Sequence, residues 1–156
     1  MPGTPVEPTE DAVESCWLPR SRRSPAEGWR ALEVLLADYP GGQQFADVGL
    51  LIVSELVTNA VVHGTPGGSR IQLVLAVGPT RLRIEVHDAR ADRGPLLRRS
   101  APDDESGRGL LLVKSLSLRW GCCPRRGVGK IVWAEVAPSA VADCSGVEPV
   151  APRGGR

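Results

Sequence analysis

Three side chains that can bind a ligand recur every four residues near the middle of the chain. Glu55, Asn59 and His63 have the spacing i, i+4 and i+8, so a helix would line them up along one side. The residues between them are mostly apolar, and burying an acid or an amide without a partner costs roughly 1–3 kcal/mol, more for a charge. The row therefore faces either solvent or a site that holds a metal ion and a ligand.

Two members of this row suit phosphate chemistry. The amide oxygen of Asn59 is a hard ligand of the kind that Mg²⁺ prefers, and Mg²⁺ keeps waters or phosphate oxygens in the rest of its shell. Glu55, one turn earlier, could orient or deprotonate a nucleophile near that metal. Two plain alternatives stay open at this stage: an amide satisfied by neighbouring backbone, and an acid in solvent.

A second candidate site is a glycine-containing segment at the predicted start of a helix. Gly107, Arg108, Gly109 and Leu110 follow residues 89–106, which show no periodicity, and they open an apolar helical run. The free N–H groups and positive dipole end of a helix start suit phosphate. An ordinary helix-entry turn also uses glycine. An 18-residue connection inside a small domain is typical of a functional lid or binding loop.

A third candidate is Asp88, which ends an alternating segment. Residues 82–88 alternate between apolar and polar side chains, which predicts a half-buried strand. Residues 71–77 form a similar run, and the Gly-Pro-Thr turn over 78–80 predicts that the two runs pair as a hairpin. Asp88 could accept a hydrogen bond from an exocyclic amine such as that of adenine, or it could simply be a turn acid at the end of a strand.

Two helices are predicted in the first half of the chain. One runs over 24–38, with Ser24 as N-cap, Pro25 at N1 and Glu27 at N3. The other runs from about residue 45 to residue 63 and ends at Gly64, which would stand at the C′ position. The second of these helices carries the Glu-Asn-His row.

The remaining elements define the fold class. A short edge strand is predicted over 14–18, and a closing hairpin over 118–122 and 130–136. The order of helices and strand pairs predicts an α/β (α+β) two-layer sandwich with helices on one face of a mixed, largely antiparallel sheet. We expect a single domain over 14–137, a disordered N-terminal extension over 1–13 and a flexible C-terminal tail over 138–156.

Composition excludes some classes of function. The chain has 156 residues and a formal net charge of +1, so no global field indicates binding to nucleic acid or to an anionic membrane. Its start has no apolar stretch typical of a signal peptide, and no apolar run approaching the ~20 residues of a membrane span is expected. The four cysteines show no CxxC spacing. Reduced thiols in the cytoplasm are therefore expected.

The order of these segments resembles that of a known superfamily. Glu-x-x-x-Asn, a strand ending in Asp, a lid and Gly-x-Gly resemble the N, G1 and G2 boxes of the GHKL ATPases, which include gyrase B, MutL and the histidine kinases. More narrowly, SELVTNAVVHG, LRIEVHDAR, GRGLLLV and GKIVWAEV resemble histidine-kinase-like ATP-binding regulators of actinobacteria, which are relatives of the anti-sigma-factor serine kinases. The resemblance covers about residues 14–137.

The resemblance implies a role for each candidate residue. Asn59 matches the asparagine that binds the Mg²⁺ bridging the ATP phosphates, and Glu55 matches the acid proposed as general base. Asp88 matches the acid that binds the adenine amine. His63 falls where this family often has a histidine or arginine, and a structural role at the helix end is an equal alternative.

For the glycine segment, the resemblance implies contacts with phosphate. Gly107 and Gly109 match the phosphate-side glycines, with Leu110 next to them, and Arg108 would offer its backbone. One departure is that Asp88 is followed by Ala89 and Arg90, where the larger superfamily has a glycine two residues after the acid. A bulky side chain there could weaken nucleotide binding or contact the nucleotide.

The function implied by the resemblance is that of a serine/threonine kinase and anti-sigma factor. It would use ATP and Mg²⁺ to phosphorylate an anti-sigma-factor antagonist and would release or capture a sigma factor. Homodimerisation is expected on the same basis. The alternative is a non-catalytic module that binds a regulator with or without nucleotide, and a third possibility is an α/β domain with none of this chemistry.

Overall fold

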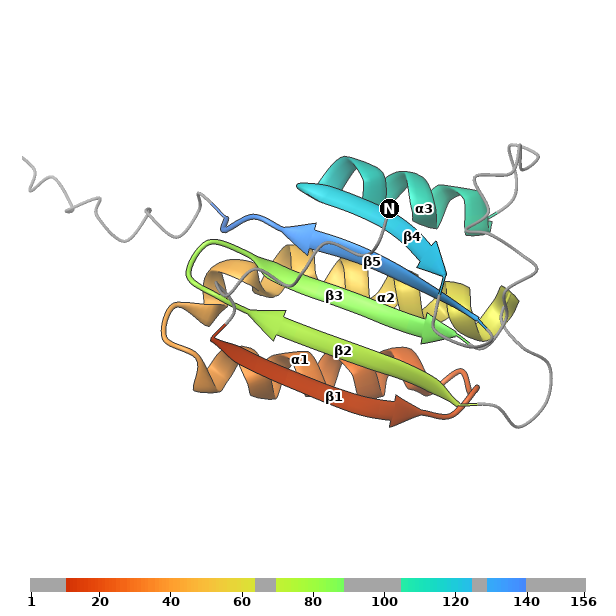
Figure 1. Ribbon diagram of the computed structural model, residues 1–156, viewed down its shortest axis with the longest axis horizontal. Helices are drawn as coiled ribbons and strands as arrows, with labels where there is room; N and C mark the ends of the chain where they lie inside the picture. Colours follow the sequence, from red (N-terminus) through yellow and green to blue (C-terminus); the bar gives the residue numbers. More distant parts are fainter. Residues whose placement is uncertain (1–10, 64–69, 89–104, 125–128, 140–156) are drawn as a thin grey trace, which may run out of the picture.

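The computed structural model describes residues 11–63, 70–88, 105–124 and 129–139, and it confirms the predicted two-layer α/β fold (Figure 1). Within these ranges, helices lie along one face of a five-stranded sheet. In chain order the elements are β1 (Ala12–Leu18), α1 (Ser24–Asp38), a 3₁₀ helix (Gly42–Phe45), α2 (Ala46–His63), β2 (Ile71–Val77), β3 (Leu82–Asp88), α3 (Glu105–Leu116), β4 (Arg119–Pro124) and β5 (Lys130–Val136).

Some predicted features lie outside the described residues. They are the C′ position of Gly64, residues 89–104 of the lid predicted over 89–106, and the terminal segments 1–10 and 140–156. The last two residues of the predicted lid belong to α3. The domain boundaries inferred from the sequence therefore stay predictions.

The sheet joins the two predicted hairpins through a pairing that links distant parts of the chain. Its strand order is β1-β2-β3-β5-β4, and every described pair is antiparallel. β3 pairs with β5 so that Leu82 lies opposite Val136 and Asp88 lies opposite Lys130. The end of β3 and the start of β5 therefore meet at one end of the sheet, in its interior strands.

Alternation in the strands decides which face the helices cover. In β2 and β3 every second side chain is buried, including Leu73, Leu75, Ile84 and Val86, each at most 1% exposed. Period-2 burial is what a sheet with one covered face requires. Figure 1 shows α1 and α2 behind that face.

α2 is the core helix of the domain. Its buried positions are Gly49, Ile52, Val53, Leu56, Val57 and Ala60. The stretch Gly42–His63 is also long and apolar enough to cross a membrane, with a mean hydropathy of 1.7, although no run of that kind was expected from the sequence. A core helix passes the same test, so the stretch is weak evidence for a membrane span.

A glycine sets how closely α1 approaches α2. A Cβ added to Gly28 would lie 2.9 Å from Cγ1 of Val53 and 3.4 Å from Cδ2 of Leu73. The first of these distances is too short for a real contact, so the position has room for no side chain. The backbone of α1 therefore packs directly onto side chains of α2 and β2.

The opposite face of the sheet carries a network of charges. Glu135 is only 4% exposed and accepts hydrogen bonds from Nη1 of Arg83 at 3.1 Å and from Nε of Arg119 at 2.9 Å. The Arg83 guanidinium also lies 4.3 Å from the centre of the Trp133 ring. Together these contacts tie β3, β4 and β5 to one another.

Several predicted boundaries differ from the structure. Ser24 is not the N-cap of α1, because the helix begins at this residue and Arg23 occupies the cap position. The Ser24 hydroxyl instead donates a hydrogen bond to the carbonyl of Pro19. The predicted first strand begins two residues earlier, at Ala12.

The second half of the chain shows similar shifts. α3 begins at Glu105, two residues before the predicted start at Gly107. β4 occupies Arg119–Pro124 instead of 118–122. In both cases the type of element is confirmed and only its ends move, which is common at helix and strand termini.

Candidate functional site

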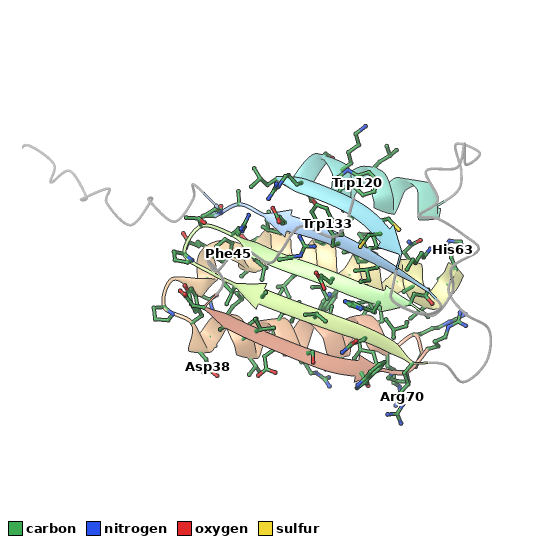
Figure 2. The ribbon with its side chains drawn as sticks, viewed as in Figure 1. Asp38, Phe45, His63, Arg70, Trp120 and Trp133 are labelled. Carbon is green, nitrogen blue, oxygen red and sulfur yellow. The ribbon has the colours of Figure 1, made fainter. Side chains whose placement is uncertain are left out.

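The candidate residues gather at one end of the two-layer structure. α2 packs against both β3 and β5. In Figure 1 the C-terminal end of α2 lies beside the end of β3 and the start of β5, and Figure 2 shows His63 at this end of the molecule. The fold therefore brings the polar row of α2 close to Asp88, which the sequence places 25 or more residues away.

The polar row borders the buried side of α2. Glu55, Asn59 and His63 are each partly buried, next to Leu56 and Ala60, which are 2% and 7% exposed. The i, i+4 spacing places the three polar side chains along one strip of the helix surface. The row is therefore neither in the core nor fully in solvent.

Two atoms of this row are buried without a hydrogen-bond partner among the described residues. They are Oδ1 of Asn59 and Nε2 of His63, which lie one helical turn apart. A buried polar atom left unsatisfied costs about 1–3 kcal/mol, and nearly all such atoms in proteins find a partner. Their environment is consistent with a ligand that supplies the missing contacts, which for an amide oxygen includes a hard cation such as Mg²⁺.

The carboxyl of Glu55 is partly removed from solvent, and this changes its pKa. Burial raises the pKa of its carboxyl above the ordinary value, because the desolvated charged form is disfavoured. A carboxylate with a raised pKa accepts a proton more readily than one in water, and perturbed acids of this kind are frequent at reactive sites. The position one turn before Asn59 is compatible with the proposed role beside a metal.

Asp88 is buried at the end of β3. Its side chain is on the same face as Ile84 and Val86, which is the face that the helices cover, and the residue is 4% exposed. Lys130, its register partner on β5, is 8% exposed and is on the same face. Charged residues are almost never this buried unless they are paired, and the sequence analysis did not single out Lys130.

The glycine segment lies inside α3. Because the helix begins at Glu105, Gly107 stands in its first turn, where backbone N–H groups lack intrahelical partners. Gly109, Arg108 and Leu110 follow within the same helix. α3 packs against α2, so its N-terminal part belongs to the same layer as the Glu-Asn-His row. The phosphate contact of this segment stays a prediction.

Arg20 is a residue near the site that the sequence analysis missed. Its Nη2 donates a hydrogen bond to the carbonyl of Val61 at 2.9 Å, in the last turn of α2. A cation at the C-terminal end of a helix satisfies a free carbonyl and interacts favourably with the dipole. Arg20 therefore fixes the end of the helix that carries Asn59 and His63. A lone arginine after a strand gives no sequence signal for this contact.

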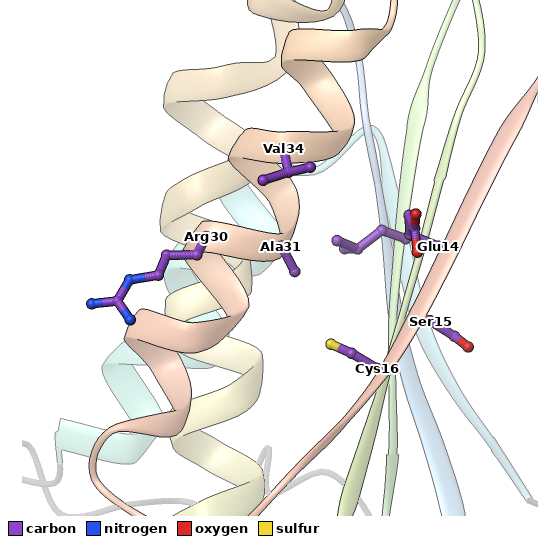
Figure 3. Close-up of a pocket in the computed structure, with 7 residues that line it drawn as sticks. Glu14, Ser15, Cys16, Arg30, Ala31 and Val34 are labelled. Carbon is purple, nitrogen blue, oxygen red and sulfur yellow. The ribbon is translucent and has the colours of Figure 1, made fainter.

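A separate cavity lies away from these residues. It has a volume of about 250 Å³ and lies between β1 and α1, where Figure 3 shows Glu14 and Cys16 across from Ala31 and Val34. Burial, with the nearby carboxylates, raises the pKa of the Cys16 thiol. None of the candidate site residues lines this cavity, so it is not part of the site described above.

Comparison with known proteins identifies the domain. A family model described as the histidine kinase-like ATPase domain matches residues 23–135, which is well over half of the chain. A search of curated proteins found no match. ATP binding is the property that this domain implies, and the buried unsatisfied oxygen of Asn59 and the buried carboxylate of Asp88 suit a nucleotide with its cation. The matched range includes α2, β3, α3 and nearly all of β5, and the chain belongs to the family of histidine kinase-like ATPase domains.

Proposed function

We propose that this protein is a serine/threonine kinase that uses ATP and Mg²⁺ to phosphorylate an anti-sigma-factor antagonist, and that it also binds a sigma factor. The observation that carries the chemistry is the row on α2, where an unsatisfied amide oxygen of Asn59 lies one turn from Glu55, whose pKa is raised. The partners and the expected homodimer rest on the sequence resemblance alone, and the cytoplasmic location rests on the expectation of reduced thiols.

Each residue has a distinct task under this proposal. Bound ATP supplies the phosphoryl group to be transferred. Asn59 would hold Mg²⁺ through its amide oxygen, and Asp88 would accept a hydrogen bond from the exocyclic amine of the base. Gly107 and Gly109 would bring backbone N–H groups towards phosphate. Glu55 would accept the proton of the attacking hydroxyl, while positioning and electrostatics provide most of the catalysis.

The test separates nucleotide binding from phosphoryl transfer. Calorimetry with and without Mg²⁺ measures ATP binding by the full chain. Transfer of labelled γ-phosphate to a purified anti-sigma-factor antagonist measures the reaction. We expect Asn59→Ala to lose Mg²⁺-dependent ATP binding, and Thr58→Ala, an exposed neighbour on α2, to keep it.

Replacing Glu55 by glutamine should remove transfer but keep binding. We expect a loss of about 10²–10⁴-fold in rate, the usual contribution of a general base. Because the carboxyl pKa is raised in the folded protein, the charged side chain opposes folding at neutral pH. Glu55→Gln should therefore be at least as stable as the wild type, so that a lost activity does not reflect unfolding.

The pH dependence follows from the same shift. The base must be deprotonated, so the rate should fall as the pH drops through the raised pKa of Glu55, and this acid limb should disappear in Glu55→Gln. If Glu55→Gln transferred phosphate at the wild-type rate, the general base would be a group other than Glu55. A wild-type protein that binds no ATP would contradict the kinase proposal and leave a module that acts by protein binding alone.

A further inference from the structure

Lys130 is an unusual lysine for its place in the sheet. The chain contains two lysines. Lys114 is exposed on α3, whereas Lys130 is 8% exposed at the start of β5. A buried ammonium group is costly unless other groups compensate for its lost hydration. Surface lysines keep a protein soluble, but a buried lysine such as Lys130 does not, so its burial calls for another role.

The register of the sheet brings Lys130 next to Asp88. The two residues are Cα partners in the antiparallel β3–β5 pair, and both belong to the face that α2 covers. Lys130 continues the row of Val132, Ala134 and Val136 on that face. Directly opposite residues on one face have Cβ atoms about 4.5–5.5 Å apart. The carboxyl group of Asp88 and the amino group of Lys130 are therefore attached at neighbouring backbone positions, at the end of the sheet where the candidate site lies.

The hydrogen-bonding groups of Asp88 and Lys130 are complementary to one edge of adenine. The base presents an exocyclic amine, which donates, beside the ring nitrogen N1, which accepts. A carboxylate only accepts, and an ammonium group has three donors and no acceptor. Because three donors are available, a contact between Lys130 and another protein group leaves N–H groups for a ligand.

We propose that Lys130 is a specificity-determining residue that donates a hydrogen bond to N1 of adenine while Asp88 accepts one from the exocyclic amine. The inference rests on the proposed nucleotide site and adds to it a second point of base recognition, on another strand. Under this proposal the site recognises both groups of the adenine edge. A nucleotide that lacks the N1 acceptor cannot accept this hydrogen bond and therefore binds more weakly.

The experiment compares ATP with 1-deaza-ATP, in which a C–H group replaces N1. Calorimetry on the full chain with Mg²⁺ should give about tenfold weaker binding of 1-deaza-ATP to the wild type, the scale of one hydrogen bond to a charged group. In Lys130→Met the affinity for ATP should fall to that for 1-deaza-ATP, and the ratio should approach one. Lys130→Arg keeps a cationic donor and should keep part of the preference. Lys114→Met is the matched control, since it removes the exposed lysine.

The outcomes distinguish this inference from the function on which it rests. Equal binding of both nucleotides to the wild type would overturn the N1 contact and leave the ATP site intact. If Lys130→Met weakened both nucleotides by the same factor, the role of Lys130 would be confined to holding Asp88, and the inference would also be overturned. If the wild type bound neither nucleotide, the proposed function itself would fail. Should Lys130→Met not fold, the wild-type comparison and Lys130→Arg still decide the question.

Discussion

Replacing Asn59 by alanine should make the protein more stable without nucleotide and less stable than the wild type with it. Oδ1 of Asn59 is buried and has no hydrogen-bond partner among the described residues. Among the described residues, no group compensates this oxygen for its lost hydration. Alanine removes the polar atom and keeps the helix, so the change relieves this cost.

The size of the effect follows from three contributions. Removing an unsatisfied buried acceptor recovers about 1–3 kcal/mol, and replacing asparagine by alanine inside a helix adds up to about 0.7 kcal/mol. Lost packing of the partly buried side chain offsets roughly 1 kcal/mol of this gain. Taken at the middle of these ranges, the contributions give a net gain of about 1–2 kcal/mol. For a chain of this length that raises Tm by about 3–6 °C.

Nucleotide should reverse the order of stability. Binding to the folded state stabilises the wild type by about 2.7 kcal/mol when free ATP is 100 times Kd, and the variant should lack this gain. Urea or thermal denaturation with and without Mg²⁺-ATP measures both values. Thr58→Ala is the control, because it changes an exposed residue on the same helix and should respond to nucleotide as the wild type does.

One result would refute this reasoning directly. If Asn59→Ala lowered the stability of the nucleotide-free protein by more than about 1 kcal/mol, Asn59 would be making structural hydrogen bonds. The amide would then be part of the scaffold, and the strongest structural support for a cation at this position would be lost.

Two further predictions concern residues that hold the fold together, one at the end of α2 and one at the end of β5 away from Asp88. Arg20→Met should lower the free energy of unfolding by about 1 kcal/mol and weaken ATP binding, because it leaves the carbonyl of Val61 at the end of α2 without this donor. If the urea midpoint and the affinity for ATP were both unchanged, this prediction would be wrong. Glu135→Gln should lower stability by about 2 kcal/mol, because arginines from three positions surround this buried carboxylate and their partial exposure reduces the full cost of breaking a buried pair. Glu33→Gln, on the exposed surface of α1, is the control for the urea denaturation.

The strands were predictable where one face is buried and the other is polar. Residues 71–77, 82–88 and 130–136 match the observed β2, β3 and β5, because alternation fixes both the type and the length of such a strand. The cap at Ser24 was not predictable, since its hydroxyl bonds to Pro19 in the preceding connection. That contact depends on how the chain enters α1, and a local cap pattern does not contain this information.

The position of the polar row on α2 was predictable, whereas its neighbours from other elements were not. The i, i+4 spacing on α2 placed Glu55, Asn59 and His63 on one strip, and the structure keeps them there. Lys130 and Arg20 were missed for a common reason. Each lies beside a partner more than 40 residues away in the chain. Only the pairing of β3 with β5 and the contact of the segment after β1 with the end of α2 bring those partners together.

The arrangement of β3 has a practical consequence for engineering the protein. Asp88 stands at one end of this strand, and the exposed turn residues Pro79 and Thr80 stand just before the other. Seven residues of strand separate the two ends, roughly 23 Å at about 3.3 Å per residue. A fluorescent reporter or an affinity tag inserted between Pro79 and Thr80 would therefore lie at the end of β3 opposite Asp88, away from the proposed nucleotide site.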